Sequence, residues 1–361
     1  MGGERLNMPI LTGGRQPYAQ DVLPHYLREE NPDILWLLLD TFMLFPWVFQ
    51  HNFAPATSIM YYPSDGEYFP KGCENVLRKF DHTVAMSMFA QQQVSSLFDI
   101  RSDYIPHATH PDIFKPFNEE EKKRCKAKFG IPKDAFVFGD VSRNQGRKMM
   151  GYEILAFAEF LKNNPKADAY LLLHTDFNDV AAHTDLINLS KRCNVIDRIK
   201  PTGMSFHKGF PLSTMVEVYN AMDVRMSSST GEGFGICSIE SMSCEIPNIN
   251  VDYTTTPELY GYPLPPIEDG HFRFVDRKEI QMGECGIGVP IATEVPGTWD
   301  VYRGFVDHFK FADAMEALYN SPKIRKKMGQ NGRKRVKKFY SWDGPHGVAR
   351  QWMDYFDKVV A

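Results

Sequence analysis

The sequence predicts an α/β protein of two domains, each a parallel sheet covered by helices, that face each other across a cleft. Short apolar runs alternate with segments of helical pattern in both halves, which favours parallel sheets. The length of 361 residues suits two domains of about 100–200 residues each. Between the halves lies a segment with three prolines, 105–116, which disfavours helix and is typical of a connector.

The first half contains four expected strands and two expected helices. The strands are 34–39, 58–62, 82–86 and 103–105, and the helices are 72–80 and 89–98. Strands that alternate with helices in this way indicate a parallel sheet with helices on its faces. We therefore expect a Rossmann-like, doubly wound domain.

The second half repeats the alternation more regularly. Its expected strands are 135–141, 169–174, 223–227 and 247–251, and its expected helices are 152–162, 184–192, 212–221 and 236–243. A last helix follows Lys338, because Val348, Trp352, Tyr355 and Phe356 have the spacing of one apolar face. The second half is thus also predicted to be doubly wound.

The composition is that of an ordinary globular protein, with 43% hydrophobic and 24% charged residues and a formal net charge of -4. The six cysteines form no CxxC pair, which argues against a zinc site or a disulfide framework and favours a reducing compartment. No apolar run approaches the ~20 residues of a membrane span, and the start lacks the pattern of a signal peptide. We expect a cytoplasmic protein.

Two segments bear on possible partners. Segment 34–49 is the richest in apolar residues and is a candidate for peripheral membrane contact, which makes a membrane-associated location the alternative. Nine of the sixteen residues in 323–338 are basic, a pattern that can attract nucleic acid or anionic lipid. No aromatic ladder or DNA-reading motif accompanies them, so we interpret the segment as a solvated helical face. Nucleic acid is not expected as a partner.

The most informative motif is the stretch 229–240, which places Glu232 and Glu240 eight positions apart across a glycine-rich turn. A strand leads into the turn and a helix follows it. Glycines let backbone N–H groups approach a ligand closely, and a helix N-terminus favours negative charge. The motif therefore predicts a site for a phosphorylated sugar, although a strand-turn-helix corner with two solvated acids has the same pattern.

These residues resemble the E-x7-E signature of the retaining glycosyltransferases of family four, which have the GT-B fold. The resemblance implies that Glu232 contacts the transferred sugar and that Glu240 binds the ribose of the nucleotide. The residues between them that are expected to bind the donor are Gly233, Phe234, Gly235 and Ile236. Segment 105–116 is similar to the hinge of these enzymes, except that Ala108 stands where glycine is usual. A second departure is Glu245, where the family has a glycine that suits a left-handed helix cap.

The resemblance also gives the domain boundaries that we expect. The ranges are 1–112 for an acceptor-side domain, 113–133 for the linker, 134–337 for the nucleotide-sugar domain and 338–361 for a helix that returns to the first domain. Pro257 and Glu258 match a loop that adjoins the nucleotide in the family. The segment 260–285 is interpreted as an insertion without an assigned role.

Two cations follow the first strand of the second domain. Arg143 and Lys148 lie five positions apart, a spacing similar to the Arg/Lys pair that family-four enzymes use on the donor diphosphate, and Arg147 is the alternate. Cationic contacts strengthen as charge builds on a leaving phosphate, so we expect Arg143 and Lys148 to be catalytic as well as binding residues. No D-x-D pair occurs, and the nearest candidate, segment 176–179, has the wrong spacing, which predicts a metal-independent reaction without a cofactor. The sequence does not identify the nucleotide of the donor, so a UDP sugar and a GDP sugar are both expected candidates.

The sequence gives weaker signals for the residues that would bind the acceptor. Tyr62 and Asp65 follow a first-domain strand and are acceptor-side candidates, with a plain Asp-Gly turn as the alternative. Gly13 and Gly14 are candidates for the glycine loop of the family's first domain, which looks shortened at its N-terminus. His107 and His110 are interpreted as hinge residues rather than catalysts.

We therefore expect a glycosyltransferase that moves a sugar, a hexose in our interpretation, to a carbohydrate or other hydroxyl acceptor with retention. The resemblance implies a front-face displacement in which the departing phosphate takes the acceptor's proton. A non-catalytic sugar-nucleotide-binding partner with a degenerate first domain is the main alternative. A phosphorylase-like GT-B enzyme is the third.

Overall fold

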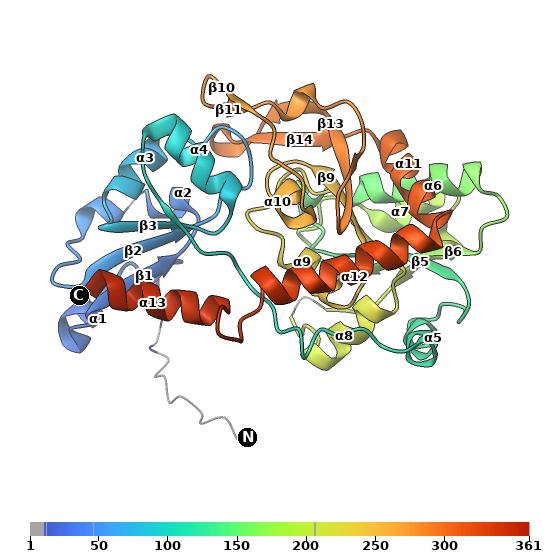
Figure 1. Cartoon of the computed structure of the whole chain (residues 1–361), viewed down its shortest axis with the longest axis horizontal. Helices are drawn as coiled ribbons and strands as arrows, with labels where there is room; N and C mark the ends of the chain where they lie inside the picture. Colours follow the sequence, from blue (N-terminus) through green and yellow to red (C-terminus); the bar gives the residue numbers. More distant parts are fainter. Residues whose placement is uncertain (1–10, 12, 46, 206, 361) are drawn as a thin grey trace.

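The computed structural model describes residues 11, 13–45, 47–205 and 207–360 (Figure 1). The first domain is a four-stranded parallel sheet whose strands follow one another in chain order. Its strands are β1 (Ile34–Leu38), β2 (Thr57–Tyr62), β3 (His82–Ala85) and β4 (Asp103–Tyr104). Its helices are α1 (Leu23–Glu30), α2 (Thr41–Leu44), η1 (Val48–Gln50), α3 (Lys71–Arg78) and α4 (Met88–Phe98). The described strands of this sheet show no reversal of order, so the doubly wound pattern expected here is not reproduced.

The second domain has an eight-stranded sheet in the order β12-β13-β9-β8-β5-β6-β7, with β14 paired to β13. The strands are β5 (Phe136–Val141), β6 (Ala169–His174), β7 (Ile199–Pro201), β8 (Val224–Ser227), β9 (Asn248–Asp252), β12 (Gln281–Met282), β13 (Gly286–Pro296) and β14 (Tyr302–Val306). The chain runs from β5 out to β7, then returns to place β8 on the other side of β5. This reversal creates a switch point between β5 and β8, where open α/β sheets bind ligands.

Helices cover the second sheet and the connection to the first domain. They are α5 (Glu119–Lys128), α6 (Met150–Asn163), α7 (Leu186–Arg192), α8 (Leu212–Asn220), α9 (Ile236–Ser243), α10 (Thr256–Tyr260), α11 (His308–Tyr319), α12 (Pro322–Phe339) and α13 (Val348–Val360), with short 3₁₀ turns η2 (Gly146–Lys148), η3 (Ile196–Arg198), η4 (Phe274–Asp276) and η5 (Thr298–Asp300). The strands and helices expected in both halves match these bounds within a few residues, except that the last helix begins at Val348 rather than directly after Lys338.

Helix α5 lies inside the segment that was expected to be linker. Asn118 caps the helix in a capping box with Glu121, which satisfies backbone N–H groups at its start. Lys126 then pairs with Asp223 at 2.7 Å and donates to the carbonyl of Ala135. Residues 119–128 are therefore a helix packed on the second domain, because capping and burial favour order over an extended connector.

Helix α13 returns to the first domain (Figure 1). The ring of Trp352 packs edge-on against Trp36 and Tyr61, with centroids 5.2 and 4.9 Å apart. The buried cluster around these rings also includes Phe234 and Tyr340 from the second domain and the chain that follows it. One apolar core thus joins the C-terminal helix to both sheets.

The insertion 260–285 also contacts the first domain. It contains the hairpin β10 (Ile267–Glu268) and β11 (His271–Phe272). The ring of Phe272 lies 5.1 Å from that of Phe89 in α4, and the backbone N–H of Phe272 donates to Glu67 at 3.1 Å. The insertion therefore bridges the nucleotide-sugar domain to α4.

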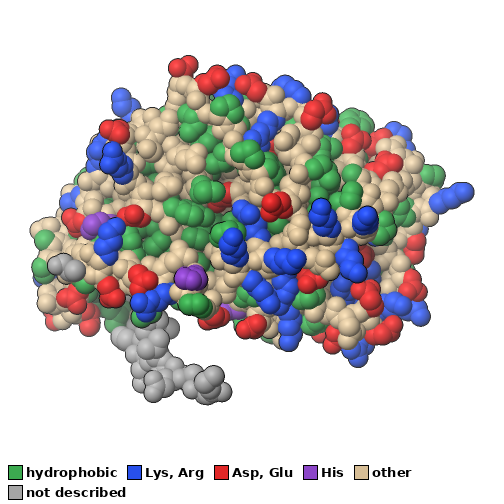
Figure 2. Space-filling model, viewed as in Figure 1, with side chains coloured by type: hydrophobic (Ala, Val, Ile, Leu, Met, Phe, Trp, Pro, Cys, Tyr) green, Lys and Arg blue, Asp and Glu red, His purple; other side chains and the backbone are tan. Residues whose placement is uncertain are grey.

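The two segments considered for partners have different environments. Segment 34–49 forms β1, α2 and η1, with Leu44 and Val48 buried in the first-domain core, and membrane contact there stays a prediction. Along α12 Figure 2 shows many Lys and Arg side chains. Arg325, Arg333 and Arg335 of this helix donate to backbone carbonyls, so they hold the helix in place. Among the described residues, no helix is long and apolar enough to cross a membrane.

Candidate active site

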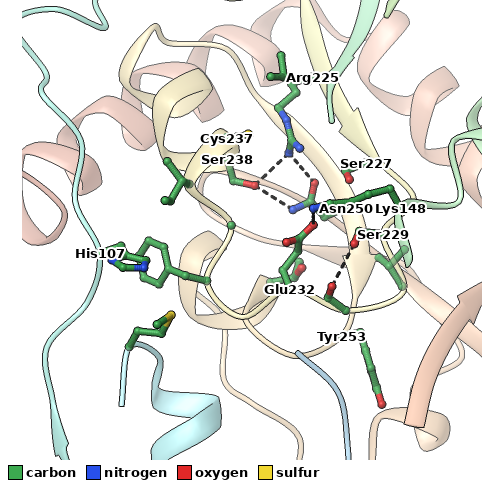
Figure 3. Close-up of a pocket in the computed structure, with 18 residues that line it drawn as sticks. His107, Lys148, Arg225, Ser227, Ser229, Glu232, Cys237, Ser238, Asn250 and Tyr253 are labelled. Atoms are coloured by element: carbon green, nitrogen blue, oxygen red, sulfur yellow. Dashed lines mark hydrogen bonds and ion pairs between the residues drawn. The ribbon is translucent and has the colours of Figure 1, made fainter. Parts of the chain in front are cut away.

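A cavity of about 290 Å³ opens where the strand order of the second sheet reverses (Figure 3). Val141 at the end of β5 and Ser227 at the end of β8 line it, as expected for ligands beyond the carboxyl ends of strands. The opposite wall is provided by Met86, after β3 of the first domain, and His107 of the connector. The cavity thus lies between the two domains.

The glycine-rich turn brings the N-terminus of α9 to this cavity. Gly235 is the N-cap and has φ 98°, a left-handed conformation that side chains rarely adopt. Gly235, Ile236, Cys237 and Ser238 line the cavity. The first N–H groups of a helix have no intrahelical partner, so this end of α9 can bind an anion.

Two other glycines of the motif are needed for the approach of the first domain. A Cβ at Gly231 would lie 1.8 Å from the carbonyl oxygen of Asp65, and one at Gly233 would lie 2.7 Å from Pro63. Either contact is too close for a side chain to be accommodated without movement. The motif therefore positions the two domains as well as an anion site.

Glu232 lies in the cavity wall and is held by two cations. The Lys148 ammonium pairs with one carboxylate oxygen (Figure 3). The Arg147 guanidinium pairs with the other at 3.1 Å. Burial alone would raise the pKa of Glu232, but Lys148 and Arg147 hold it well below its usual range. Glu232 is therefore ionised at neutral pH.

Arg147 also connects the cavity to the first domain. Its Nε lies 3.4 Å from the Asp65 carboxylate, and Arg303 of β14 pairs with the same carboxylate at 2.9 Å. Burial, together with the nearby Asp65, raises the pKa of Asp40 to about 6. Acidic residues of the first domain and basic residues of the second thus meet at the domain boundary.

Arg225, on β8, lines the cavity and was missed by the sequence-based reasoning. It donates to Ser238 at 3.0 Å and to Asn250 at 3.1 Å (Figure 3). It also pairs with Asp140 at 3.2 Å. Burial raises the pKa of Asp140 even though Arg225 lowers it. The sequence did contain a signal for this residue, because Arg225 is a charged residue within the expected strand 223–227. A buried cation requires a partner, so its position in a strand indicates a polar site nearby.

His107 faces the cavity from the connector, although it was interpreted as a hinge residue. Its Nδ1 lies 3.2 Å from the Tyr61 hydroxyl, and its ring packs edge-on against Phe234. Burial lowers the pKa of His107 to about 4. The imidazole is therefore neutral at pH 7 and can exchange a hydrogen bond with a ligand.

Two predicted site residues lie apart from Glu232. Arg143 pairs with Asp179 at 2.7 Å and lines a different hollow, so the expected convergence of Arg143 with Lys148 is not what the structure shows. Arg147, the alternate, takes that place. Glu240 lies further along α9 and accepts a hydrogen bond from the Tyr219 hydroxyl at 2.5 Å. Burial raises the pKa of Glu240, and its role toward a ribose stays a prediction.

Of the acceptor-side candidates, one lies beside the cavity and the others lie apart from it. Asp65 is in the ionic cluster at the domain boundary. Tyr62 is fully buried in the first-domain core, where its hydroxyl pairs with Ser102 at 2.8 Å, so its selection as an acceptor-side residue is corrected. Its side chain packs between sheet and helices because alternate residues of a strand point to opposite faces. Gly13 and Gly14 precede α1, where Gly14 packs on Asp21, and they are not among the described residues that line the cavity.

Glu258, in the loop expected to adjoin the nucleotide, instead binds α4 of the first domain. Its carboxylate accepts from the backbone N–H groups of Met88 and Phe89 at 2.6 and 3.3 Å. Burial raises the pKa of Glu258 to about 8. This residue therefore caps a helix across the domain boundary.

No protein-family model matches the chain. Among curated proteins, the D-inositol 3-phosphate glycosyltransferase of Stackebrandtia nassauensis is 22% identical over 244 residues, which are 66% of this chain and 52% of that protein. The one of Corynebacterium diphtheriae is 27% identical over 59% of this chain and 40% of that protein. The putative glycosyltransferase EpsD of Bacillus subtilis is 26% identical over 63% and 47%. The chain thus spans about half the length, or less, of these curated relatives.

Solved structures resemble the chain over nearly its whole length. Sucrose-phosphate synthase of Thermosynechococcus elongatus has a TM-score of 0.70 at 17% identity, covering 94% of this chain and 77% of that one. Anabaena HepE in complex with UDP-glucose has a TM-score of 0.71 at 14% identity, covering 97% and 86%. The chain has the GT-B fold. The predicted GT-B fold with two Rossmann-like domains is confirmed, although the first sheet is not doubly wound, and homologues of this GT-B chain are named as glycosyltransferases.

Proposed function

We propose that this GT-B chain is a glycosyltransferase that moves a hexose from a nucleotide diphosphate sugar to a hydroxyl acceptor, with retention and without a metal. One observation carries the proposal. A single cavity at the switch point of the second sheet brings together Lys148, Glu232 and the N-terminus of α9, and the first domain closes its other side. Curated relatives named as glycosyltransferases support the reaction class.

The anion site would hold the donor diphosphate. Backbone N–H groups at the start of α9 supply donors with a fixed direction, and Lys148 supplies a positive charge. The buried Arg225 in the cavity wall adds positive potential, although Asp140 offsets part of its charge. These groups stabilise the negative charge that grows on the diphosphate as the glycosidic bond breaks.

Glu232 would orient the transferred sugar. Because it stays ionised, its carboxylate can only accept hydrogen bonds, which suits sugar hydroxyls. In the proposed displacement the bond between the anomeric carbon and the diphosphate oxygen breaks. The acceptor oxygen then bonds to the same face of that carbon, and its proton passes to the departing phosphate. Neutral His107 is placed to accept a hydrogen bond from the sugar or the acceptor.

The first donor to test is a UDP sugar. HepE, whose structure resembles this chain, was solved with UDP and with UDP-glucose. Two observations support metal independence. Cationic groups surround the cavity, and Asp179 of segment 176–179, the nearest candidate for a D-x-D metal motif, is paired with Arg143. Transfer that continues in EDTA would support this part of the proposal.

The deciding experiment is a thermal-shift screen of the purified chain with UDP, GDP, UDP-glucose and GDP-mannose, followed by donor turnover. A ligand that binds the folded state raises its apparent stability by mass action. We expect stabilisation by one nucleotide family and release of free nucleotide from its sugar. Nucleotide binding without turnover, across donors and acceptors, would instead indicate a binding partner. Proton NMR of the product's anomeric centre tests retention.

A further inference from the structure

A second cleft, of about 690 Å³, lies between the domains beside the β13–β14 hairpin. The first domain contributes Phe45, Tyr68 and Lys71 to it. The hairpin contributes Trp299, Asp300 and Tyr302. Neither the nucleotide-sugar motif nor the ionic cluster around Glu232 includes these residues.

The aromatic rings of this cleft are exposed to an unusual degree. Trp299 is 55% exposed and Tyr68 is 46% exposed, although both are large and partly apolar. The Tyr68 ring is stacked with both Tyr302 and His271, with centroids 5.0 and 4.3 Å apart, whereas Trp299 is stacked on Phe42 at 5.8 Å. Stacking on Phe42 covers one face of the Trp299 ring and leaves the other face of this exposed ring available to a ligand. Apolar surface exposed in a concave site marks a place where a ligand binds.

The backbone holds these side chains in strained conformations. Tyr68, Trp299 and Asp300 have φ values of 67°, 63° and 58°, in the left-handed region that non-glycine residues rarely adopt. Such strain persists at ligand sites where the surrounding structure enforces it. Strain of this kind on both sides of one cleft indicates that its shape is enforced.

The cleft is connected to the donor cavity. Tyr253 lines the donor cavity, and its hydroxyl donates to the backbone oxygen of Tyr302 at 3.0 Å. The next residue, Arg303, pairs with Asp65, which in turn pairs with Arg147 beside Glu232. The aromatic cleft and the donor cavity are therefore on two sides of the same ionic cluster.

We propose that the aromatic cleft binds a saccharide, with a pyranose ring packed against the exposed face of Trp299. A pyranose has an apolar face of C–H groups, which packs on the negative face of an aromatic ring, and an edge of hydroxyls. Lys71, Asp300 and the two tyrosine hydroxyls supply hydrogen-bonding groups around the rings. That this saccharide is the acceptor rests on the proposed transferase function.

Saturation-transfer NMR of the whole chain tests the site, with oligomers of glucose, mannose and N-acetylglucosamine at millimolar concentration. We expect at least one to bind, and Trp299→Ala to weaken its binding about 3–10-fold, the value of one aromatic contact. Trp299→Phe keeps an aromatic face and should retain most of the affinity. Leu212→Ala, at a site 54% exposed at the start of α8, is the matched control and should change nothing.

The readouts separate this proposal from the transferase function. UDP affinity is measured in parallel by calorimetry, and Trp299→Ala should leave it unchanged. If a saccharide binds but no nucleotide does, the transferase function fails and the saccharide site remains. If no oligomer binds, or if Trp299→Ala binds it as well as the native chain, the cleft proposal is overturned. A membrane surface and a second copy of the chain are the other possible occupants of the cleft. If Trp299→Ala, unlike Leu212→Ala, abolishes binding of the chain to anionic vesicles or abolishes a dimer, the cleft proposal is overturned as well.

Discussion

Replacement of Glu232 by Gln separates two roles of the acidic motif. In the structure the carboxylate neutralises Lys148 and Arg147, so a donor diphosphate must compete with it for the same cations. The three side chains are 17–30% exposed. Each ion pair should therefore contribute about 1 kcal/mol of free energy, near the upper end of the values for exposed pairs. In the variant Arg147 keeps Asp65 as a partner, whereas Lys148 loses its carboxylate. A diphosphate that binds Lys148 then no longer has to break an ion pair of about 1 kcal/mol. UDP affinity should then rise about fivefold.

Turnover should move in the opposite direction. Loss of a charged group that acts on the transition state costs about 100-fold or more in rate. Isothermal titration with UDP and the rate of UDP release from UDP-glucose measure the two effects in one preparation. Lys148→Met is the comparison, because loss of the cation should weaken UDP binding about tenfold and slow turnover. Near-normal turnover in Glu232→Gln, or weaker UDP binding, would refute this account of the site.

Three further variants test the fold and its ionic groups. Glu245→Gly should raise the free energy of unfolding by about 1 kcal/mol in urea titrations, because Glu245 has φ 61° at the end of α9, where glycine is unstrained; no gain would contradict this. Arg225→Met should lower the free energy of unfolding by about 3–5 kcal/mol, because Asp140 is left buried without its cation. Adding Asp140→Asn should restore much of this loss. The pKa of Glu258 rises from 4.5 to about 8 on folding, so its stabilising contribution is complete below pH 4.5 and is lost as pH rises through 8. Glu258→Gln should flatten this part of the stability-pH profile, and an unchanged profile would exclude the assignment.

The secondary structure was largely predictable because it depends on local patterns. Apolar runs of strand length and helical periodicities located the four strands of the first sheet, strands β5, β6, β8 and β9 of the second, and the helices between them. Strands β7, β12, β13 and β14 were not among the expected elements. Helix α5 was placed in the linker because its highly charged sequence has little apolar periodicity, and its order comes from Asn118 and from the pairing of Lys126 with Asp223. That pairing joins residues 97 positions apart, which no local pattern can indicate.

The candidate site was predictable in part for the same reason. Glu232, Lys148 and the start of α9 lie in motifs that follow strands, and parallel strands bring such loops to one edge of the sheet. The pairing of Arg143 with Asp179 joins the ends of different loops and depends on their exact conformations. His107 reaches the cavity only because the domains are packed together, and sequence alone gives no measure of that packing.

The domain arrangement and the anion site depend on the same few residues. Gly231 admits the Asp65 backbone, and the Asp65 side chain pairs with Arg147, whose other partner is Glu232. A diphosphate that reached Lys148 and Arg147 would therefore compete with a carboxylate from each domain. Donor binding must then change the strength of the contact between the domains, since the cations that hold both acids would be shared with the ligand. Under the proposed transferase function, the acidic motif links occupancy of the cavity to the position of the first domain, which forms the other side of that cavity.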